Sequence, residues 1–393
     1  MWGRNRSARH RLRATWPEAC RPVSAMCIAG RPGGHHWKIT GPLFSAYSRQ
    51  TLGCINSPLR RLREGRRLDI YFNRSDSNDD LCSRIYQGEL AILSPSAASL
   101  AFVEHARNQI ESAFAPRHPQ QAHEELDVAL TVEILARLKP QFIHHPQTRV
   151  HLRRLLIEAG CDPYQSFQDV PRLRVAYPAD YLSTGLAYAH HPHRDTWYSA
   201  PLCQLNWWMP IYDFEANQGM AFHPRYWGAA IRNSSADFNY YQWNADGRRN
   251  AVQHVKSDTR VQPRALEPLE TEPDVRLVVP VGGIIVFSAA HLHSTVRNET
   301  ARARWSIDFR TVNLGDLALG RGPVTSDSAS TGTSLRDFRR VADFAPMPDD
   351  IVARYDDASV GRGVAVFNPG AARTEDAQSP AKRIEKTTKV GAP

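Results

Sequence analysis

The second half of the chain is a series of short β-rich runs, and this series constrains the fold more than any other feature. From residue 172 onward the runs are RLRVAYP, QLNWWMPIY, VRLVVPV, GGIIVFS and RWSIDFRTV. They are rich in β-branched and aromatic residues, and clusters of Pro, Gly, Asn and Asp separate them, as is typical of strands joined by turns. The sequence therefore predicts a β-sandwich or barrel in this region.

Amphipathic segments precede these strands, at residues 98–114, 123–142 and 149–160. Their apolar residues recur at helical spacing, and the last segment ends at Gly160, a residue type common just after a helix. In the first segment the apolar stripe consists of Leu100, Val103, Ala106, Ile110 and Phe114. Helices followed by strands favour an α+β fold with a mainly β core and flanking N-terminal helices.

Charge and composition divide the chain into three parts. Residues 1–67 hold 14 Lys and Arg but only 2 Asp and Glu, whereas the remainder holds 35 basic and 38 acidic residues. We expect residues 1–80 to be a basic, disordered extension and residues 81–320 to form the barrel domain, with a long insertion at about 214–274. Residues 321–393 are expected to form a C-terminal helix around LRDFRRVADF and a disordered tail.

The same features bear on location and partners. The six cysteines are scattered without a C-x-x-C pair, which indicates free thiols in a reducing compartment. No run of 18 apolar residues is present, and the start of the chain lacks an apolar signal region, so we expect a cytoplasmic protein without a membrane partner. The Arg-rich start leaves organellar targeting open, as well as the alternative that these residues lie outside the functional protein. A nucleic-acid partner is not expected, because only the leader is basic.

Candidate metal ligands lie in two separate segments. In HHPHRDTWY, residues 190–198, His193 and Asp195 are two positions apart and would point the same way if the backbone is extended. The run GGIIVFSAAHLHSTVRN supplies His291 and His293 directly after an apolar strand, and either can be the third ligand. Two histidines and one carboxylate on one face of the metal are the ligand set of non-haem Fe(II) oxygenases.

An arginine strand follows the second histidine segment. In RWSIDFRTV, Arg304 and Ser306 share one strand face, and an arginine fork suits a carboxylated co-substrate to which a serine adds a hydroxyl donor. Arg302 shares this face and is the alternative arginine.

These motifs together resemble those of the Fe(II)/2-oxoglutarate-dependent oxygenases, most closely the phytanoyl-CoA dioxygenase-like family, over roughly residues 83–313. The motifs are HRD, a Gly-containing strand, Leu-His-Ser-Thr-x-x-Asn and Arg-x-Ser. The resemblance implies a double-stranded β-helix, a jelly-roll or cupin-like barrel, that uses Fe(II), 2-oxoglutarate and O2. It implies His193, Asp195 and His293 as catalytic metal ligands and Arg304 as the 2-oxoglutarate arginine.

The resemblance also implies further co-substrate contacts. A tryptophan after the HxD strand corresponds to Trp208 or Trp207, and a hydroxyl just after the distal histidine corresponds to Thr295 or Ser294. The stretch GMAFHPRYW departs from the family's turn after Pro224, so no residue of the insertion is carried over.

Several other residues have open roles. His190 and His191 are expected at the surface or in a substrate pocket, and His223 either touches substrate or is structural. A set of aromatic residues lines a pocket or belongs to the core: Trp197, Tyr198, Trp207, Trp208, Tyr226 and Trp227.

The expected function is oxidation of a small organic molecule, usually hydroxylation, with release of succinate and CO2. Asp195 favours hydroxylation, desaturation or ring formation over halogenation, because related halogenases lack a carboxylate there. Arg304 and Arg310 form R-x5-R, which is similar to the nucleic-acid dealkylating branch of the superfamily, so that branch is an alternative. A non-catalytic metal-binding cupin-like barrel and a sugar-binding or isomerising barrel are further alternatives, and the oligomeric state stays open.

Overall fold

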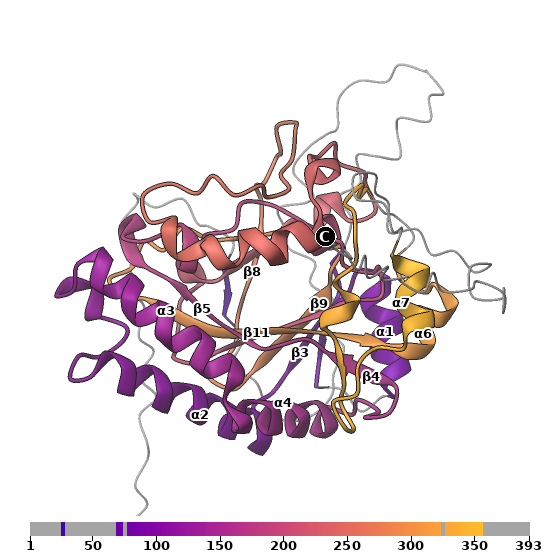
Figure 1. The fold of residues 1–393 in the computed structure, drawn as a ribbon, viewed down its shortest axis with the longest axis horizontal. Helices are drawn as coiled ribbons and strands as arrows, with labels where there is room; N and C mark the ends of the chain where they lie inside the picture. Colours follow the sequence, from indigo (N-terminus) through magenta and orange to yellow (C-terminus); the bar gives the residue numbers. More distant parts are fainter. Residues whose placement is uncertain (1–24, 28–67, 74–76, 324–326, 357–393) are drawn as a thin grey trace, which may run out of the picture.

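The computed structural model describes residues 25–27, 68–73, 77–323 and 327–356. The fold is mixed α/β, with a mainly β core of two sheets (Figure 1). The larger sheet has the strand order β12-β4-β11-β6-β9-β3-β2, and β5 pairs with β11. Its strands are β2 Ile70–Phe72, β3 Leu90–Leu93, β4 Ser166–Gln168, β5 Arg172–Ala176, β6 Leu205–Pro210, β9 Ile284–Ser288, β11 Arg304–Asn313 and β12 Arg339–Arg340.

The smaller sheet has the order β1-β8-β7-β10. Its strands are β1 Ala25–Cys27, β7 Met220–Phe222, β8 Val275–Val278 and β10 His293–Thr295. All five runs that were expected to form strands do so, as β5, β6, β8, β9 and β11. An isolated antiparallel bridge joins His193 to His293 and so attaches the HHPHRD segment to the free edge of β10.

The helices are α1 Asn78–Tyr86, α2 Ala97–Phe114, α3 Val128–His144, α4 Pro146–Glu158, α5 Tyr240–Gln242, α6 Leu314–Leu319 and α7 Asp349–Tyr355. Helices α2 and α4 run side by side below the larger sheet in Figure 1. The three helices expected from apolar spacing are confirmed as α2, α3 and α4. Helix α3 begins later than expected, because Ala122–Glu124 form a separate 3-10 turn and the Asp127 side chain caps Leu130 N–H.

Strand β11 shows how the core and the interior polar face are divided. Trp305, Ile307 and Phe309 belong to the apolar core between the larger sheet and the helices. Trp305 packs edge-on against Phe114 of α2, with ring centroids 5.6 Å apart. Because successive strand side chains point to opposite faces, the polar residues between them point away from the helices.

The prediction of a C-terminal helix around LRDFRRVADF is wrong. Residues Ser334–Asp337 form a 3-10 turn, and Arg339–Arg340 form β12, which pairs with β4. Pairing with β4 therefore determines the local structure there, and the next helix is α7, further along the chain.

Most of the residues expected to form disordered ends lie outside the described part of the chain, although β1, β2 and the start of α1 precede residue 81. Of the cysteines in the described part, Cys82, Cys161 and Cys203 are buried and unbridged. The described helices include none with the length and apolar character needed to cross a membrane.

Candidate metal centre

His193 and His293 face each other as a backbone-bonded pair. The backbone N–H of each donates to the carbonyl of the other, at 3.0 Å in both directions. The two imidazole rings consequently lie with centroids 4.4 Å apart. Two segments that are far apart in sequence are thus held in register by the sheet edge, which places both rings on one side.

Each ring is also oriented by its own chain. Nδ1 of His193 contacts the carbonyl of His191 at 2.8 Å, and Nδ1 of His293 contacts the carbonyl of His291 at 2.9 Å. A carbonyl can only accept, so Nδ1 carries the proton in both rings and Nε2 keeps a free lone pair. This pattern of a second ring nitrogen bonded to an acceptor is the usual arrangement for metal-binding histidines.

Asp195 completes the group. Its Oδ1 lies 3.4 Å from Nε2 of His193 and 3.9 Å from Nε2 of His293. One ligand atom from each of the three residues falls within 4.8 Å of the others, and all three residues are buried. The residues therefore fit a metal ion held by two imidazoles and one carboxylate on one face.

The surroundings of Asp195 and His293 favour the protonation states that a metal requires. Burial raises the pKa of Asp195, but the contact with His193 and the charge of Arg310 outweigh it, so the pKa lies well below its ordinary value. Burial, together with the charge of His193, lowers the pKa of His293 to about 3. At neutral pH Asp195 is therefore a carboxylate and His293 a neutral imidazole, the forms in which they bind a metal.

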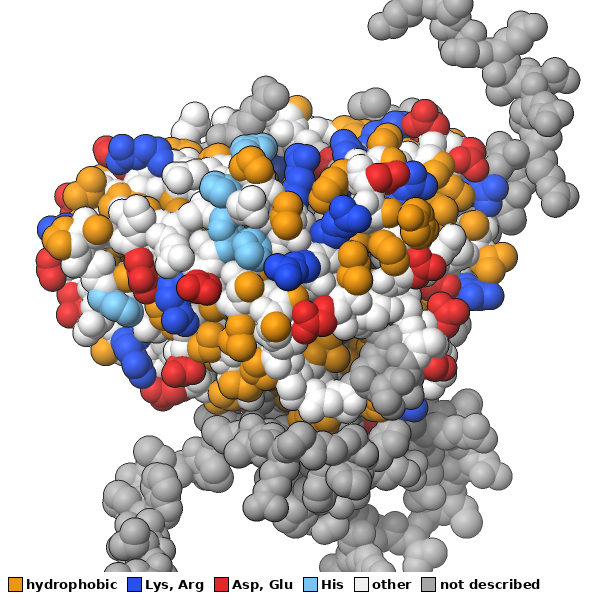
Figure 2. Space-filling view, turned by 90° about the horizontal axis from the view of Figure 1, so that it is seen from below, with side chains coloured by type: hydrophobic (Ala, Val, Ile, Leu, Met, Phe, Trp, Pro, Cys, Tyr) orange, Lys and Arg blue, Asp and Glu red, His pale blue; other side chains and the backbone are white. Residues whose placement is uncertain are grey.

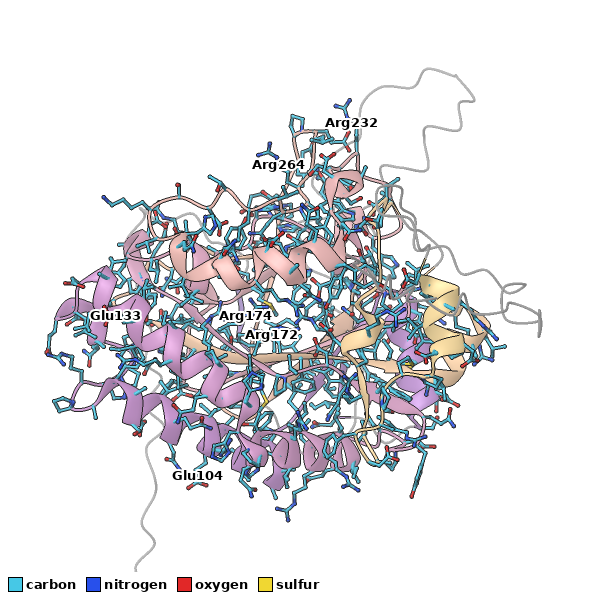
Figure 3. All side chains as sticks on the ribbon, in the orientation of Figure 1. Glu104, Glu133, Arg172, Arg174, Arg232 and Arg264 are labelled. Carbon is cyan, nitrogen blue, oxygen red and sulfur yellow. The ribbon has the colours of Figure 1, made fainter. Side chains whose placement is uncertain are left out.

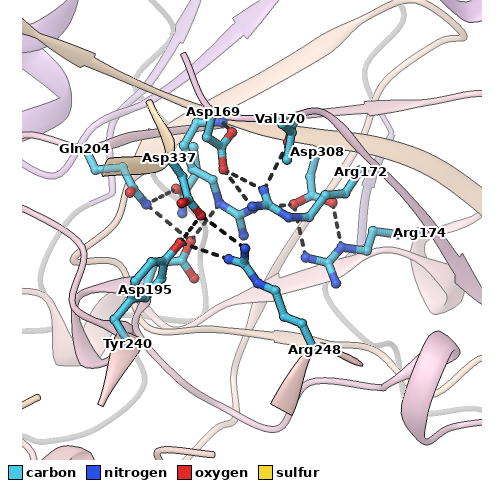
Figure 4. A network of polar contacts seen from close by, with 12 residues as sticks. Asp169, Val170, Arg172, Arg174, Asp195, Gln204, Tyr240, Arg248, Asp308 and Asp337 are labelled. Carbon is cyan, nitrogen blue, oxygen red and sulfur yellow. Dashed lines mark hydrogen bonds and ion pairs between the residues drawn. The ribbon is translucent and has the colours of Figure 1, made fainter. Parts of the chain in front are cut away.

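Two side chains contact the second carboxylate oxygen of Asp195, Oδ2. Gln204 Nε2 and Arg310 Nε both lie 3.5 Å from Asp195 Oδ2. Arg310 in turn contacts Asp169 at 3.5 Å and Asp308 at 3.2 Å. This carboxylate–arginine network fixes the orientation of Asp195 (Figure 4).

Arg304 lies in the same pocket as the metal group and is buried. Its Nε donates to the carbonyl of Gln218 at 3.0 Å, and Nη1 donates to Ser306 Oγ at 2.6 Å. Within the described part of the chain it has no ion-pair partner. Burial lowers the pKa of Arg304 to about 10, which leaves it charged at neutral pH. A buried arginine without a carboxylate is suited to a carboxylate ligand.

The structure distinguishes the alternatives that the sequence left open. His291 is buried away from the metal group, with its Nε2 3.1 Å from the carbonyl of Gly88 and its ring against Trp227. Arg302 is half exposed at the surface and lies 3.9 Å from Glu215. His293 and Arg304 are therefore the residues that enter the pocket.

The expected co-substrate contacts lie around Arg304 and the metal group. The Trp208 ring lies 5.5 Å from the Arg304 guanidinium, whereas Trp207 bonds Thr311 and stacks on Phe309. Both tryptophans, Ser294 and Thr295 line the pocket. The Thr295 hydroxyl accepts from the backbone N–H of His190 at 3.1 Å.

The remaining histidines and aromatic residues divide between pocket and core. His190 lines the pocket and stacks on His193 with ring centroids 4.8 Å apart, and its Nδ1 has no hydrogen-bond partner among the described residues. His191 contacts the carbonyl of Pro263, and His223 lies between Ser294 and Thr271, outside the pocket lining. Of the aromatic set, Tyr198 also lines the pocket, whereas Trp197, Tyr226 and Trp227 do not.

The pocket has a volume of about 570 Å³. The insertion supplies one of its walls through Phe238, Tyr240, Trp243, Arg248 and Arg260. Sequence reasoning did not identify these residues or the polar side chains of β5. The alternation of Arg172 and Arg174 with apolar residues was an available signal, because it places charge on one face of a strand within the β core.

No protein-family model matches the chain, and no curated protein sequence matches it. EvdO2 from Micromonospora carbonacea var. aurantiaca, solved with 2-oxoglutarate, is 14% identical, and the match covers 61% of this chain and 92% of that chain at a TM-score of 0.36. The epimerase SnoN, solved with Fe3+, alpha ketoglutarate and nogalamycin RO, is 15% identical, with 69% and 97% covered at a TM-score of 0.31. The non-heme alpha ketoglutarate dependent carbocyclase SnoK is 12% identical, with 61% and 85% covered at a TM-score of 0.30. At these TM-scores we derive the chemistry from the residues of this chain.

Proposed function

We propose that this protein is an Fe(II)/2-oxoglutarate-dependent oxygenase that oxidises a small organic molecule. The observation that carries the proposal is the joint presence, in one pocket, of the His193–Asp195–His293 group and of Arg304 without an ion-pair partner in the described chain. A metal site alone suits many functions. A metal site beside a buried carboxylate-binding arginine suits a co-substrate that chelates the metal at one end and carries a carboxylate at the other.

The strand pairing supports a double-stranded β-helix as the framework of this site. The order β5-β11-β6-β9 gives one layer, and β10-β7-β8 with the bridge at His193 gives the other. We also propose membership of the phytanoyl-CoA dioxygenase-like family and a barrel domain at about residues 81–320. A cytoplasmic location is a further proposal, and the unbridged Cys82, Cys161 and Cys203 support it.

The residues of the chain have separate tasks in the proposed reaction. His193, Asp195 and His293 would hold Fe(II) through two imidazole nitrogens and one carboxylate oxygen. Arg304 binds the distal carboxylate of 2-oxoglutarate with help from Ser306, and Trp208 packs against the guanidinium. When bound, Fe(II) and 2-oxoglutarate supply the oxidising chemistry, in which 2-oxoglutarate and O2 are consumed and succinate and CO2 are released.

The outcome of the reaction is hydroxylation, desaturation or ring formation. Asp195 occupies a ligand position with an ionised carboxylate, which excludes a halide from that position. The pocket, at about 570 Å³, has room for the co-substrate and a small molecule.

An anaerobic titration of Fe(II) and 2-oxoglutarate into the metal-free protein tests this proposal. We expect a visible metal-to-ligand charge-transfer band in the wild type, no band in His193→Ala or His293→Ala, and a band that requires at least about tenfold more 2-oxoglutarate in Arg304→Met. Arg302→Met, at an exposed arginine of the same segment, is the matched control and should behave as the wild type. A folded, metal-loaded wild type without the band would refute the proposal.

A further inference from the structure

One wall of the pocket carries more positive charge than its carboxylates balance. Lys139 of α3, Arg172 and Arg174 of β5, and Arg310 of β11 all line the pocket, and we call these four residues the cationic wall. Figure 3 shows Arg172 and Arg174 near the centre of the view, whereas the other labelled residues lie toward its edge. Besides the metal ligand Asp195, the carboxylates that line the pocket are Asp169 and Asp308.

These two carboxylates are shared among the arginines of the wall. Asp169 is 2.5 Å from Arg172 and 3.5 Å from Arg310. Asp308 accepts from Arg174 Nε at 2.6 Å and from Arg174 Nη2 at 3.3 Å, and it lies 3.2 Å from Arg310 (Figure 4). Asp195 also lies 3.5 Å from Arg310, so three carboxylates contact the three arginines, and one of these carboxylates is an expected metal ligand. Nη1 of Arg174 has no hydrogen-bond partner among the described residues.

Lys139 adds a fourth basic group, which has no ion-pair partner in the described chain. Its ammonium group donates to the carbonyl of Leu186, a neutral acceptor. Burial and then the charge of Arg174 lower the pKa of Lys139 to about 7, and burial outweighs the attraction of Asp169 in lowering the pKa of Arg172. The wall is thus crowded with positive charge, and an anion would relieve this repulsion.

The wall adjoins the metal group but differs from the arginine assigned to 2-oxoglutarate. Arg310 reaches to 3.5 Å from Asp195, so a ligand on the wall lies beside the metal. Arg304 bonds Gln218 and Ser306 at the other end of the polar face of β11. The insertion adds the aromatic side chains of Phe238 and Trp243 to the lining of the same pocket.

We propose that the substrate carries an anionic group, a carboxylate or a phosphate, which binds the cationic wall and places the rest of the molecule between the metal and the aromatic side chains of the insertion. This inference rests on the proposed function, because it requires Arg304 to be taken by 2-oxoglutarate. Lys139 is then a specificity-determining residue, whose charge selects anionic over neutral molecules of the same shape.

The experiment uses the full chain with Fe(II) and saturating 2-oxoglutarate under anaerobic conditions, with benzoate, its neutral isostere benzamide, and inorganic phosphate as probes at constant ionic strength. Binding is measured by calorimetry and by the change in the charge-transfer band. We expect saturable binding of phosphate and benzoate, with benzoate at least about tenfold tighter than benzamide, because a charge-assisted bond is lost in the amide.

Lys139→Met is the informative variant, because removal of Lys139 breaks no ion pair between described residues. It should weaken benzoate and phosphate binding about tenfold and leave benzamide binding unchanged. Lys139→Arg should restore most of the selectivity, and Lys256→Met, at an exposed lysine of the insertion, should have no effect.

Three results would overturn the inference. In the first, the wild type binds neither anion or binds benzoate and benzamide equally. In the second, Lys139→Met keeps the wild-type selectivity. In the third, phosphate competes with 2-oxoglutarate. The band in the probe-free samples reports on the proposed function separately. A wild type that shows the band but no anion selectivity refutes only the anionic substrate, whereas a wild type without the band refutes the oxygenase.

Discussion

At the scale of single residues, His291 and His293 show how two positions separate a structural histidine from a metal ligand. Both are buried. His291 lies in the turn before β10, and its Nε2 lies 3.1 Å from the carbonyl of Gly88. His293 is the first residue of β10, and its Nε2 lies 3.9 Å from Asp195 in the metal group. The sequence places both after the same apolar strand and so could not choose between them from the residues alone.

This difference predicts opposite phenotypes for the two alanine variants. His293→Ala should lower metal affinity by more than the roughly 10–100-fold loss typical of outer-shell changes and should alter stability little in the metal-free protein. His291→Ala should keep metal binding but lower the free energy of unfolding by about 1–3 kcal/mol, because a buried carbonyl loses its donor. Calorimetric metal titration and urea unfolding measure the two effects. Metal loss in His291→Ala would contradict the assignment.

Arg310 is a positioning residue in this scheme, because it contacts Asp195 rather than the metal. Arg310→Met should weaken metal binding roughly 10–100-fold, since an outer-shell partner that orients a ligand carboxylate is lost. The effect should appear in Co(II) or Ni(II) binding, with no need for turnover. Arg302→Met is the control. Equal metal affinity in both variants would show that Gln204 alone is enough to hold Asp195.

At the scale of secondary structure, sequence periodicity gave the elements but not all of their partners. The helices α2, α3 and α4 were predictable because their apolar residues recur at helical spacing, and the five strand runs because β-branched and aromatic residues are concentrated between turn residues. The segment 335–344 was also expected to form a helix, and it contains Leu335, Phe338 and Val341. All three are buried, but pairing of β12 with β4 prevails there. Tertiary pairing overrides local spacing in this short segment.

The contact between α2 and α4 contains a group of histidines that links stability to pH. His105 of α2 lies 4.8 Å from His145 and 4.9 Å from His151, measured between ring centroids. Figure 2, which views the molecule from this side, shows histidine side chains gathered among charges of both signs. Burial, followed by the charges of His151 and His145, lowers the pKa of His105 to about 4. Burial, followed by the charge of Arg154, lowers the pKa of His151, and the charge of Glu104 opposes this shift.

The sign of the pH dependence follows from this lowered pKa. Below about pH 6.5 the unfolded chain binds a proton at His105 that the folded protein excludes, so stability falls. The free energy of unfolding should therefore be highest above pH 6.5 and should decline as the pH falls toward about 4. Urea unfolding across this range should show a shallower decline in His105→Gln, while His144→Gln, at an exposed histidine, should keep the wild-type slope. An identical slope in His105→Gln would contradict this origin.

At the scale of the whole molecule, the site exists only when both sheets are assembled. His293 belongs to the smaller sheet, whereas Arg304 and Arg310 belong to β11 of the larger one. His193 and Asp195 could be proposed as metal ligands from the sequence because their spacing is local, whereas His293 lies 98 positions after Asp195 and its choice over His291 came from the family resemblance. The partners of Arg310 and the crowding around Lys139 could not be predicted, because contacts such as those between Asp169 and Arg310 join residues that are more than a hundred positions apart.

The proposed sites for the metal and for 2-oxoglutarate include residues of both sheets. Binding of either molecule should therefore stabilise the two sheets together. Each ligand at a hundred times its dissociation constant should raise the free energy of unfolding by about 2.7 kcal/mol, provided that the unfolded chain does not bind it. Anaerobic urea unfolding should show this increment with Fe(II) and its loss with a chelator. His293→Ala should lose both increments, whereas Arg304→Met should keep the metal increment and lose most of that from 2-oxoglutarate. Equal stabilisation of Arg304→Met and the wild type by 2-oxoglutarate would place the co-substrate elsewhere and remove Arg304 from the site.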